Sequence, residues 1–162
     1  MLSCKKNLVR ISGTFLYIGR IPGPGGTIGS LVVYGPAFLM VYSGVHEPLF
    51  TCIWACVCSV SALLSVFVGR NALGVFGKTD PNEVVIDEIA GASLSLLLYP
   101  SAFSGPGIVS LFLLFRFFDI LKPFGIRKLE HVGGGLGIVL DDLAAGFFPL
   151  VIIQISRFIF KA

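Results

Sequence analysis

The chain has 162 residues, of which 55% are hydrophobic and only 13% are charged, and its mean hydropathy is +0.91. Soluble domains carry about 25% charged residues, so this chain has too little charge to cover a water-soluble surface, and it is too hydrophobic to be disordered. The net charge of +3, with no dense run of basic residues, excludes a nucleic-acid-binding protein. We therefore expect one domain, residues 1–162, embedded in a membrane.

Five apolar segments are expected to form helices. In chain order they are residues 31–45, 49–68, 84–99, 108–121 and 143–160. The second segment is uncharged and has the length of a membrane-spanning helix. The third and fourth are predicted to be the arms of a helical hairpin, because Pro100 and a Gly-Pro-Gly run at 105–107 interrupt the apolar stretch between them. The predicted fold is an all-α, membrane-embedded bundle of about four to five apolar helices, the last of which either crosses or lies partly in the interface.

The basic residues predict the orientation of this bundle. Up-and-down threading places ten of the 12 on one side of the membrane, and Arg157 and Lys161 are the exceptions. The ten are Lys5, Lys6, Arg10, Arg20, Arg70, Lys78, Arg116, Lys122, Arg127 and Lys128. Because positive charge marks the cytoplasmic side, the polar segments 13–30, 69–88 and 116–142 are expected to meet at the cytoplasmic face. We expect a functional site there.

The first acidic cluster surrounds the start of the third segment. Asp80, Glu83 and Asp87 share one face of a predicted helix that has Asp80 as its N-cap and Pro81 in its first turn, with Glu88 beside them. A solvated helix end explains Asp80 and Glu83 equally well. Asp87 and Glu88, however, directly precede a wholly apolar stretch, where carboxylates are costly unless they are paired, metal-bound or functional.

Arg116, Asp119 and Lys122 are spaced three residues apart, which places them on one side of the fourth helix. An arginine–aspartate pair at this spacing is often a plain ion pair on a helix surface. Arg116 nevertheless ends an apolar arm, and its guanidinium is suited to bidentate hydrogen bonding with a phosphate.

Two glycine-rich stretches accompany these charges. The residues at 133–137 lead into Asp141 and Asp142 at a predicted helix start, where capping is the simpler interpretation and a Mg²⁺ site the alternative. Residues 23–30 open the first apolar helix, whose backbone N–H groups form either an anion site or a plain interfacial turn. Acids for a metal, bases for an anion and glycine turns on one membrane face together indicate a phosphorylated lipid headgroup held through Mg²⁺.

Four motifs carry a resemblance to a known family. They are Thr-Ile-Gly-Ser-Leu at 27–31, Val-Val-Ile-Asp-Glu at 84–88 with Gly91, Phe-Arg-Phe-Phe-Asp-Ile-Leu-Lys-Pro at 115–123, and Gly-Gly-Leu-Gly-Ile-Val-Leu-Asp-Asp at 134–142 with Ala145 and Gly146. In this order they resemble the phosphatidylglycerophosphatase A family over residues 13–146. Gly25 departs from the proline usual in the family, and Gly133 from the histidine of some members.

The resemblance implies an all-α, Mg²⁺-dependent phosphatase that converts phosphatidylglycerophosphate to phosphatidylglycerol in bacterial membranes. It thus predicts a phospholipid substrate and a multi-pass protein of the bacterial cytoplasmic (inner) membrane. The motifs of cysteinyl- and aspartyl-phosphate phosphatases are absent from the sequence, which leaves metal-assisted attack by water.

The candidate residues then take three roles. The Mg²⁺ ligands are Asp80, Asp87, Glu88, Asp141 and Asp142; the catalytic residues are Asp119, Glu88 and Asp142; the substrate-binding residues are Thr27, Gly29, Ser30, Arg116 and Lys122. Asp119 would orient the attacking water or protonate the leaving glycerol oxygen. The two bases would neutralise the transferring phosphoryl group, and residues 27–30 would hold its oxygens.

Three other functions share some of these sequence features. A CDP-alcohol phosphatidyltransferase also uses Mg²⁺ and aspartates on lipid headgroups, but its Asp-x-x-Asp-Gly-x-x-Ala-Arg motif is absent. A small membrane transporter would place acids near mid-span, whereas these cluster at segment ends. A non-catalytic scaffold would tolerate loss of the acids. Lipid phosphate hydrolysis is the function that the sequence favours.

Overall fold

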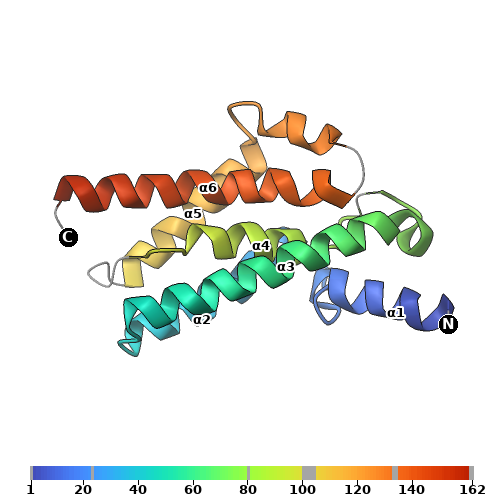
Figure 1. Cartoon of the computed structure of the whole chain (residues 1–162), viewed down its shortest axis with the longest axis horizontal. Helices are drawn as coiled ribbons and strands as arrows, with labels where there is room; N and C mark the ends of the chain where they lie inside the picture. The colour runs from blue at the N-terminus through green and yellow to red at the C-terminus, as the bar shows by residue number, and fades with distance from the viewer. Residues whose placement is uncertain (1, 23, 80, 100–104, 133–134, 161–162) are drawn as a thin grey trace.

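The computed structural model describes residues 2–22, 24–79, 81–99, 105–132 and 135–160 (Figure 1). Its elements are α1 (Leu2–Gly13), η1 (Ile18–Arg20), α2 (Gly25–Tyr42), α3 (Glu47–Phe76), α4 (Ile86–Ser95), α5 (Gly105–Leu121), η2 (Ile126–His131) and α6 (Gly135–Phe160). Within these ranges there is no strand, so the predicted all-α fold is confirmed.

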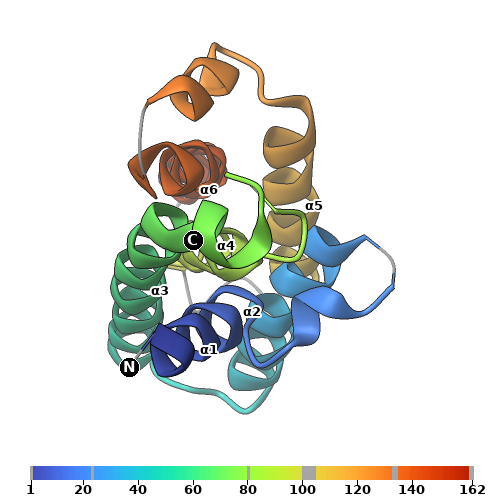
Figure 2. The same cartoon turned by 90° about the vertical axis from the view of Figure 1, so that its right-hand side faces the viewer.

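The short helix α4 forms the centre of the molecule. Viewed along the bundle, it is surrounded by α2, α3, α5 and α6 (Figure 2). Eight of its ten residues are buried, and small residues at 90–93 allow the neighbouring helices to approach. Ten helical residues extend about 15 Å, half of the ~30 Å hydrocarbon core. The segment 84–99, predicted as a hairpin arm, is therefore a buried half-length helix.

Three helices are long and apolar enough, by length and composition, to cross a membrane: α2, α3 and residues 135–159 of α6. The uncharged segment 49–68 lies inside the longer α3, and the last apolar segment is part of α6, which continues through Pro149. The other hairpin arm is α5, whose 17 residues include 105–107 in the first turn, where a proline is well tolerated. Pro100 lies outside the described residues. A bundle of four to five apolar crossings stays a prediction.

The start of α4 differs from the predicted one. The helix begins at Ile86, and residues 81–85 form a turn, so the prediction that Glu83 shares a helix face with Asp87 is wrong. The Val84 N–H donates to the Pro81 carbonyl at 2.9 Å, and the Val85 N–H donates to the Gly13 carbonyl at 2.9 Å. A contact with the end of α1 thus takes the donor that a longer helix would use. Asp80 lies outside the described residues.

The start of α6 also differs. The helix begins at Gly135, which makes Asp141 and Asp142 its seventh and eighth residues, nearly two turns from its N-terminus. The prediction that these acids stand at a helix start is therefore wrong, and neither of them caps the helix. Gly133 and Gly134 lie outside the described residues.

A contact between glycines brings α4 and α6 together. A Cβ at Gly146 would collide with the Gly91 carbonyl oxygen, and one at Gly91 would collide with the Asp142 carbonyl oxygen. Because only glycine leaves room for this crossing, the backbones touch directly. The contact sets the first turn of α4, with Asp87 and Glu88, beside the acids of α6.

The opposite end of the bundle carries a separate ion pair. The Arg157 guanidinium lies 3.1 Å from the Glu47 carboxylate, which joins the last turns of α6 to the start of α3. This base, an exception to the one-sided distribution predicted from the sequence, is therefore at the far end from α1 and from the starts of α4 and α6 (Figure 1).

Candidate active site

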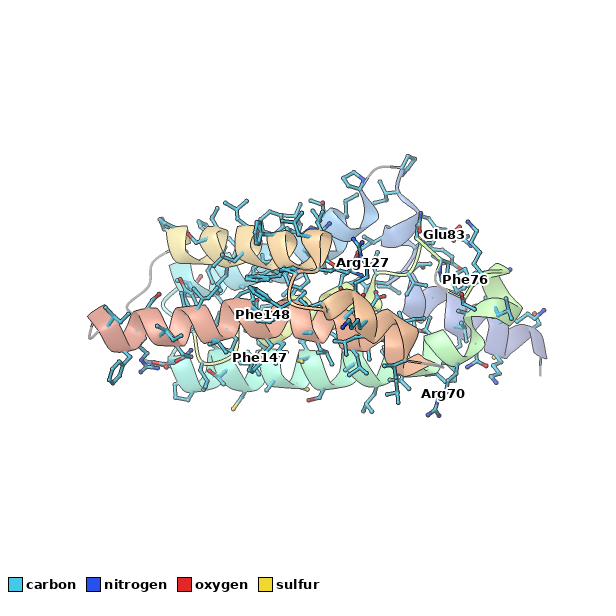
Figure 3. All side chains as sticks on the ribbon, turned by 90° about the horizontal axis from the view of Figure 1, so that it is seen from above. Arg70, Phe76, Glu83, Arg127, Phe147 and Phe148 are labelled. Atoms are coloured by element: carbon cyan, nitrogen blue, oxygen red, sulfur yellow. The ribbon has the colours of Figure 1, made fainter. Side chains whose placement is uncertain are left out.

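A cavity of about 930 Å³ opens at the end of the bundle where α2, α4 and α6 begin and α5 ends. Its charged lining residues are Arg20, Glu83, Asp87, Glu88, Arg116, Asp119, Lys122, Asp141 and Asp142. Figure 3 shows Glu83 in the same half of the molecule as Arg70 and Arg127. The cavity thus gathers charges from η1, the turn before α4, and helices α4, α5 and α6.

The acids on α4 and α6 form the buried side of this cavity. Asp87, Asp141 and Asp142 are only 7%, 6% and 5% exposed. Asp142 interacts electrostatically with all four of the other carboxylates contributed by the three helices, including Glu88 and Asp119. Buried carboxylates this close repel one another, so the site favours a positively charged ligand.

Two cations, one on α5 and one directly after it, pair with two of the cavity's acids. Arg116 Nη1 lies 2.5 Å from Asp119 Oδ2, one helical turn away, and Lys122 Nζ lies 2.5 Å from Asp141 Oδ2 on α6. The four side chains are no more than 20% exposed. Lys122 has a φ of 45°, a left-handed conformation that ends α5. The pairs keep both cations at the cavity wall, where they can bind an anion.

The first turn of α2 packs against the Glu88 side chain. A Cβ at Gly26 would collide with Glu88 Oε1 and lie 2.9 Å from Arg116 Nη1, and one at Gly29 would lie 2.7 Å from Glu88 Oε2. Gly25 and Gly26 both line the cavity. Glycine in this turn therefore makes room for a carboxylate and a guanidinium beside the α2 backbone.

The other residues predicted on α2 are differently placed. The Ser30 hydroxyl is fully buried and donates to the Gly26 carbonyl at 2.7 Å. Within the described part of the chain, the cavity wall does not include Thr27, Gly29 or Ser30. The structure thus brings the predicted residues of α4, of the end of α5 and of α6 to one cavity, whereas the three predicted residues of α2 are not part of its lining.

A sequence model of the family described as phosphatidylglycerophosphatase A matches residues 11–157. The chain belongs to the phosphatidylglycerophosphatase A family. Among curated proteins it is 37% identical over 92 residues to phosphatidylglycerophosphatase A of Haemophilus influenzae, covering 56% of each chain. It is 29% identical over 129 residues to the Escherichia coli protein of the same name, covering 79% of this chain and 71% of that one. The predicted family is therefore confirmed, and the chain is a phosphatase.

A further relative carries a different name. Over 151 residues the chain is 32% identical to a Bacteroides thetaiotaomicron protein named "Putative phosphatidylinositol-3-phosphatase", covering 91% of this chain and 92% of that protein. No solved structure significantly matches the chain. Both names describe phosphatases of phospholipids, so the family supports a phospholipid substrate.

The donor set of this family member fits Mg²⁺ in its chemistry, because Mg²⁺ prefers carboxylate oxygens and Asp87, Glu88 and Asp142 supply them in one cavity. Among the described residues, however, no three acid, histidine or cysteine side chains form a ready metal-binding group. The carboxylates would have to rotate toward one another to surround an ion.

Two charged residues of the phosphatidylglycerophosphatase A cavity were not predicted as part of the site. Arg20 and Glu83 line it and form an ion pair of 3.1 Å, although 63 residues separate them. No local pattern links them, since Arg20 ends η1 and Glu83 lies in the turn before α4, and these two segments meet only in the folded chain. The glycines at 25 and 26, by contrast, were visible in the glycine-rich segment that precedes α2.

Proposed function

We propose that the chain hydrolyses phosphatidylglycerophosphate to phosphatidylglycerol and phosphate in this cavity, by Mg²⁺-dependent attack of water. One observation carries the proposal. In a member of this phosphatase family, six carboxylates and three cations from separate parts of the chain line one cavity at the end of an apolar bundle. Carboxylates suit a divalent cation, and cations suit the phosphate that it would share.

The cations bind and orient the phosphate. Arg116 is the more buried of the cavity's two guanidinium groups, and its hydrogen bond to Asp119 orients it. Lys122 adds a second positive charge, held by Asp141. Both charges offset the negative charge that develops on the phosphoryl oxygens during hydrolysis.

Asp119 is the proposed proton-transfer residue of the reaction. A phosphate bound by Arg116 lies next to the Asp119 carboxylate, because the two side chains are hydrogen-bonded. Asp119 would then orient the attacking water or protonate the leaving glycerol oxygen. Glu88 packs against Gly26 of α2 beside the Arg116 guanidinium, and in this proposal it shares the proton transfer with Asp142.

The proposed Mg²⁺ ligands are the acids of α4 and α6, namely Asp87, Glu88, Asp141 and Asp142. Asp80, which lies outside the described residues, is a further candidate. When bound, Mg²⁺ supplies positive charge that offsets these carboxylates and polarises the phosphate ester. The Gly91–Gly146 contact between α4 and α6 keeps the carboxylates within reach of one another.

The proposed location is the bacterial inner membrane, with the cavity on the cytoplasmic face. The bases of α1, of the end of α3 and of η2 lie at the cavity's end of the bundle, as Arg70 and Arg127 show in Figure 3. Positive charge favours the cytoplasmic side.

The test is phosphate release by the full chain, purified in detergent and mixed with phosphatidylglycerophosphate in micelles. We expect phosphate with Mg²⁺ and none with excess EDTA. Phosphatidylinositol 3-phosphate forms a second arm, because one relative is named for it. Faster release from phosphatidylinositol 3-phosphate would make that lipid the preferred substrate in place of phosphatidylglycerophosphate. Absence of release from both lipids would overturn the proposal.

A further inference from the structure

Arg20 is the one cation that lines the outer rim of the cavity in the described part of the chain. Its side chain is 44% exposed, whereas Arg116 and Lys122 are 15% and 20% exposed. Two contacts orient it: Arg20 Nε lies 3.1 Å from Glu83 Oε2, and the guanidinium carbon lies 5.3 Å from the centre of the Tyr17 ring. Because each contact occupies only part of the guanidinium, N–H groups remain that can donate to an anion at the cavity rim.

The backbone before Arg20 is built in an unusual way. Phe15, Leu16 and Tyr17 have φ values of 44°, 56° and 68°, three successive left-handed residues without a glycine. Buried Thr14 holds this turn, since its hydroxyl accepts from the Tyr17 N–H at 3.0 Å and donates to the Arg10 carbonyl at 2.8 Å. Such conformations are costly and persist where the surroundings enforce them. Here they turn the chain from α1 back to the cavity rim.

Exposed apolar side chains lie near Arg20 in the sequence. Leu16, Tyr17 and Ile21 are 68%, 45% and 50% exposed, and they flank Arg20 on both sides in the sequence. Exposed apolar and aromatic side chains next to an arginine are typical of the membrane–water interface, where the charge lies at the level of the lipid headgroups. The rim that carries Arg20 is therefore the side of the cavity from which a lipid would enter.

The lipid of the proposed reaction carries two phosphates. The terminal phosphomonoester is hydrolysed, and a phosphodiester lies between it and the acyl chains. When the monoester reaches Arg116 and Lys122 inside the cavity, the diester remains nearer the apolar rim. We propose that Arg20 binds this phosphodiester and thereby positions the lipid for hydrolysis. The inference rests on the proposed function and assigns the second half of the substrate to a residue outside the catalytic cluster.

Each product of the reaction carries only one of the two phosphate groups, so the two products test the two halves of the proposed site independently. Phosphatidylglycerol keeps the diester and has lost the monoester, whereas inorganic phosphate has no diester. Phosphate release from phosphatidylglycerophosphate in mixed micelles is measured for wild type, Arg20→Gln, Arg20→Lys and the control Lys128→Gln, with each product as an inhibitor. Lys128 is an exposed cation at the same end and does not line the cavity.

We expect Arg20→Gln to raise both KM and the inhibition constant of phosphatidylglycerol about tenfold, the value of one charge-assisted hydrogen bond at a half-exposed site. The inhibition constant of inorganic phosphate should stay within about twofold, kcat should fall far less than KM rises, and Arg20→Lys should recover part of the loss. Lys128→Gln should behave as wild type. Since the Arg20–Glu83 pair is exposed, unfolding temperatures should differ by less than about 2 °C.

Arg20→Gln with an unchanged KM, or with phosphate inhibition weakened as much as phosphatidylglycerol inhibition, would overturn the inference. If wild type releases no phosphate from phosphatidylglycerophosphate, the proposed function fails instead. In that case, direct binding of phosphatidylglycerol to wild type and to Arg20→Gln in nanodiscs still decides the role of Arg20. Equal affinities would refute it, and a tenfold weaker affinity of the variant would support it.

Discussion

Replacing Gly91 by alanine tests whether the close crossing of α4 and α6 builds the site. A Cβ at Gly91 would collide with the Asp142 carbonyl oxygen, and it would lie 2.7 Å from the Asp142 carbonyl carbon and 3.0 Å from Phe115 Cε2. The first two neighbours are backbone atoms, so relief requires one helix to move. Movement of α6 displaces Asp142 relative to the first turn of α4.

The expected loss of stability is worked out by comparison with a matched control, Gly74→Ala. Gly74 lies in α3, and a Cβ there would meet nothing within 4 Å. Gly74→Ala should therefore stabilise the helix by about 0.5–1 kcal/mol through the unfolded chain's entropy. Gly91→Ala brings the same gain, opposed by about 1–3 kcal/mol of overpacking. At roughly 2–4 °C per kcal/mol, its unfolding temperature should be about 2–12 °C below that of Gly74→Ala.

Thermal unfolding in detergent and phosphate release from phosphatidylglycerophosphate are the assays. Because small displacements of catalytic groups are costly, we expect Gly91→Ala to lose at least about tenfold in kcat at temperatures where it is folded. Gly74→Ala should keep its activity. If Gly91→Ala unfolds at or above the temperature of Gly74→Ala with activity within twofold of wild type, the crossing does not position the carboxylates.

Three further outcomes are expected. Arg116→Lys keeps the charge but loses the planar guanidinium that can donate to two phosphate oxygens at once, so kcat/KM measured by phosphate release should fall about 100-fold, and a fall of less than threefold would argue against phosphate binding there. Mg²⁺ at about 100 times its Kd should stabilise wild type by about 2.7 kcal/mol, seen as a rise of about 5–11 °C in unfolding temperature that EDTA reverses; no rise would count against the metal site. Glu47→Gln breaks the partly exposed pair with Arg157 at the far end, so activity should stay within twofold and stability within about 1 kcal/mol, as judged by the same two assays.

The convergence of charges could be predicted because it depends on chain direction and helix period. Once apolar segments alternate in direction, Asp87, Arg116 and Asp142 must lie near one end of the bundle. The spacing of three between Arg116 and Asp119 also predicts their contact, and the structure has it as a hydrogen bond. The roles assigned to these residues stay predictions.

What the sequence did not reveal depends on contacts between distant segments. The start of α4 is decided by the hydrogen bond from the Val85 N–H to the Gly13 carbonyl. The pairing of Arg20 with Glu83 requires η1 to lie beside the turn before α4. Neither has a periodic signal. A ten-residue apolar helix is too short to cross the membrane, so its sequence does not show where it lies. The burial of α4 depends on the helices that surround it.

The most direct test of the proposed active site compares the Mg²⁺-dependent kcat of Asp142→Asn and Asp119→Asn with that of Glu47→Gln on phosphatidylglycerophosphate. Asp142 is 5% exposed among like charges, so asparagine removes a repelling carboxylate and should not unfold the protein. We predict that each aspartate variant loses at least about 100-fold while Glu47→Gln stays within twofold of wild type. Full Mg²⁺-dependent phosphate release by both aspartate variants would contradict the assignment of this cavity as the active site.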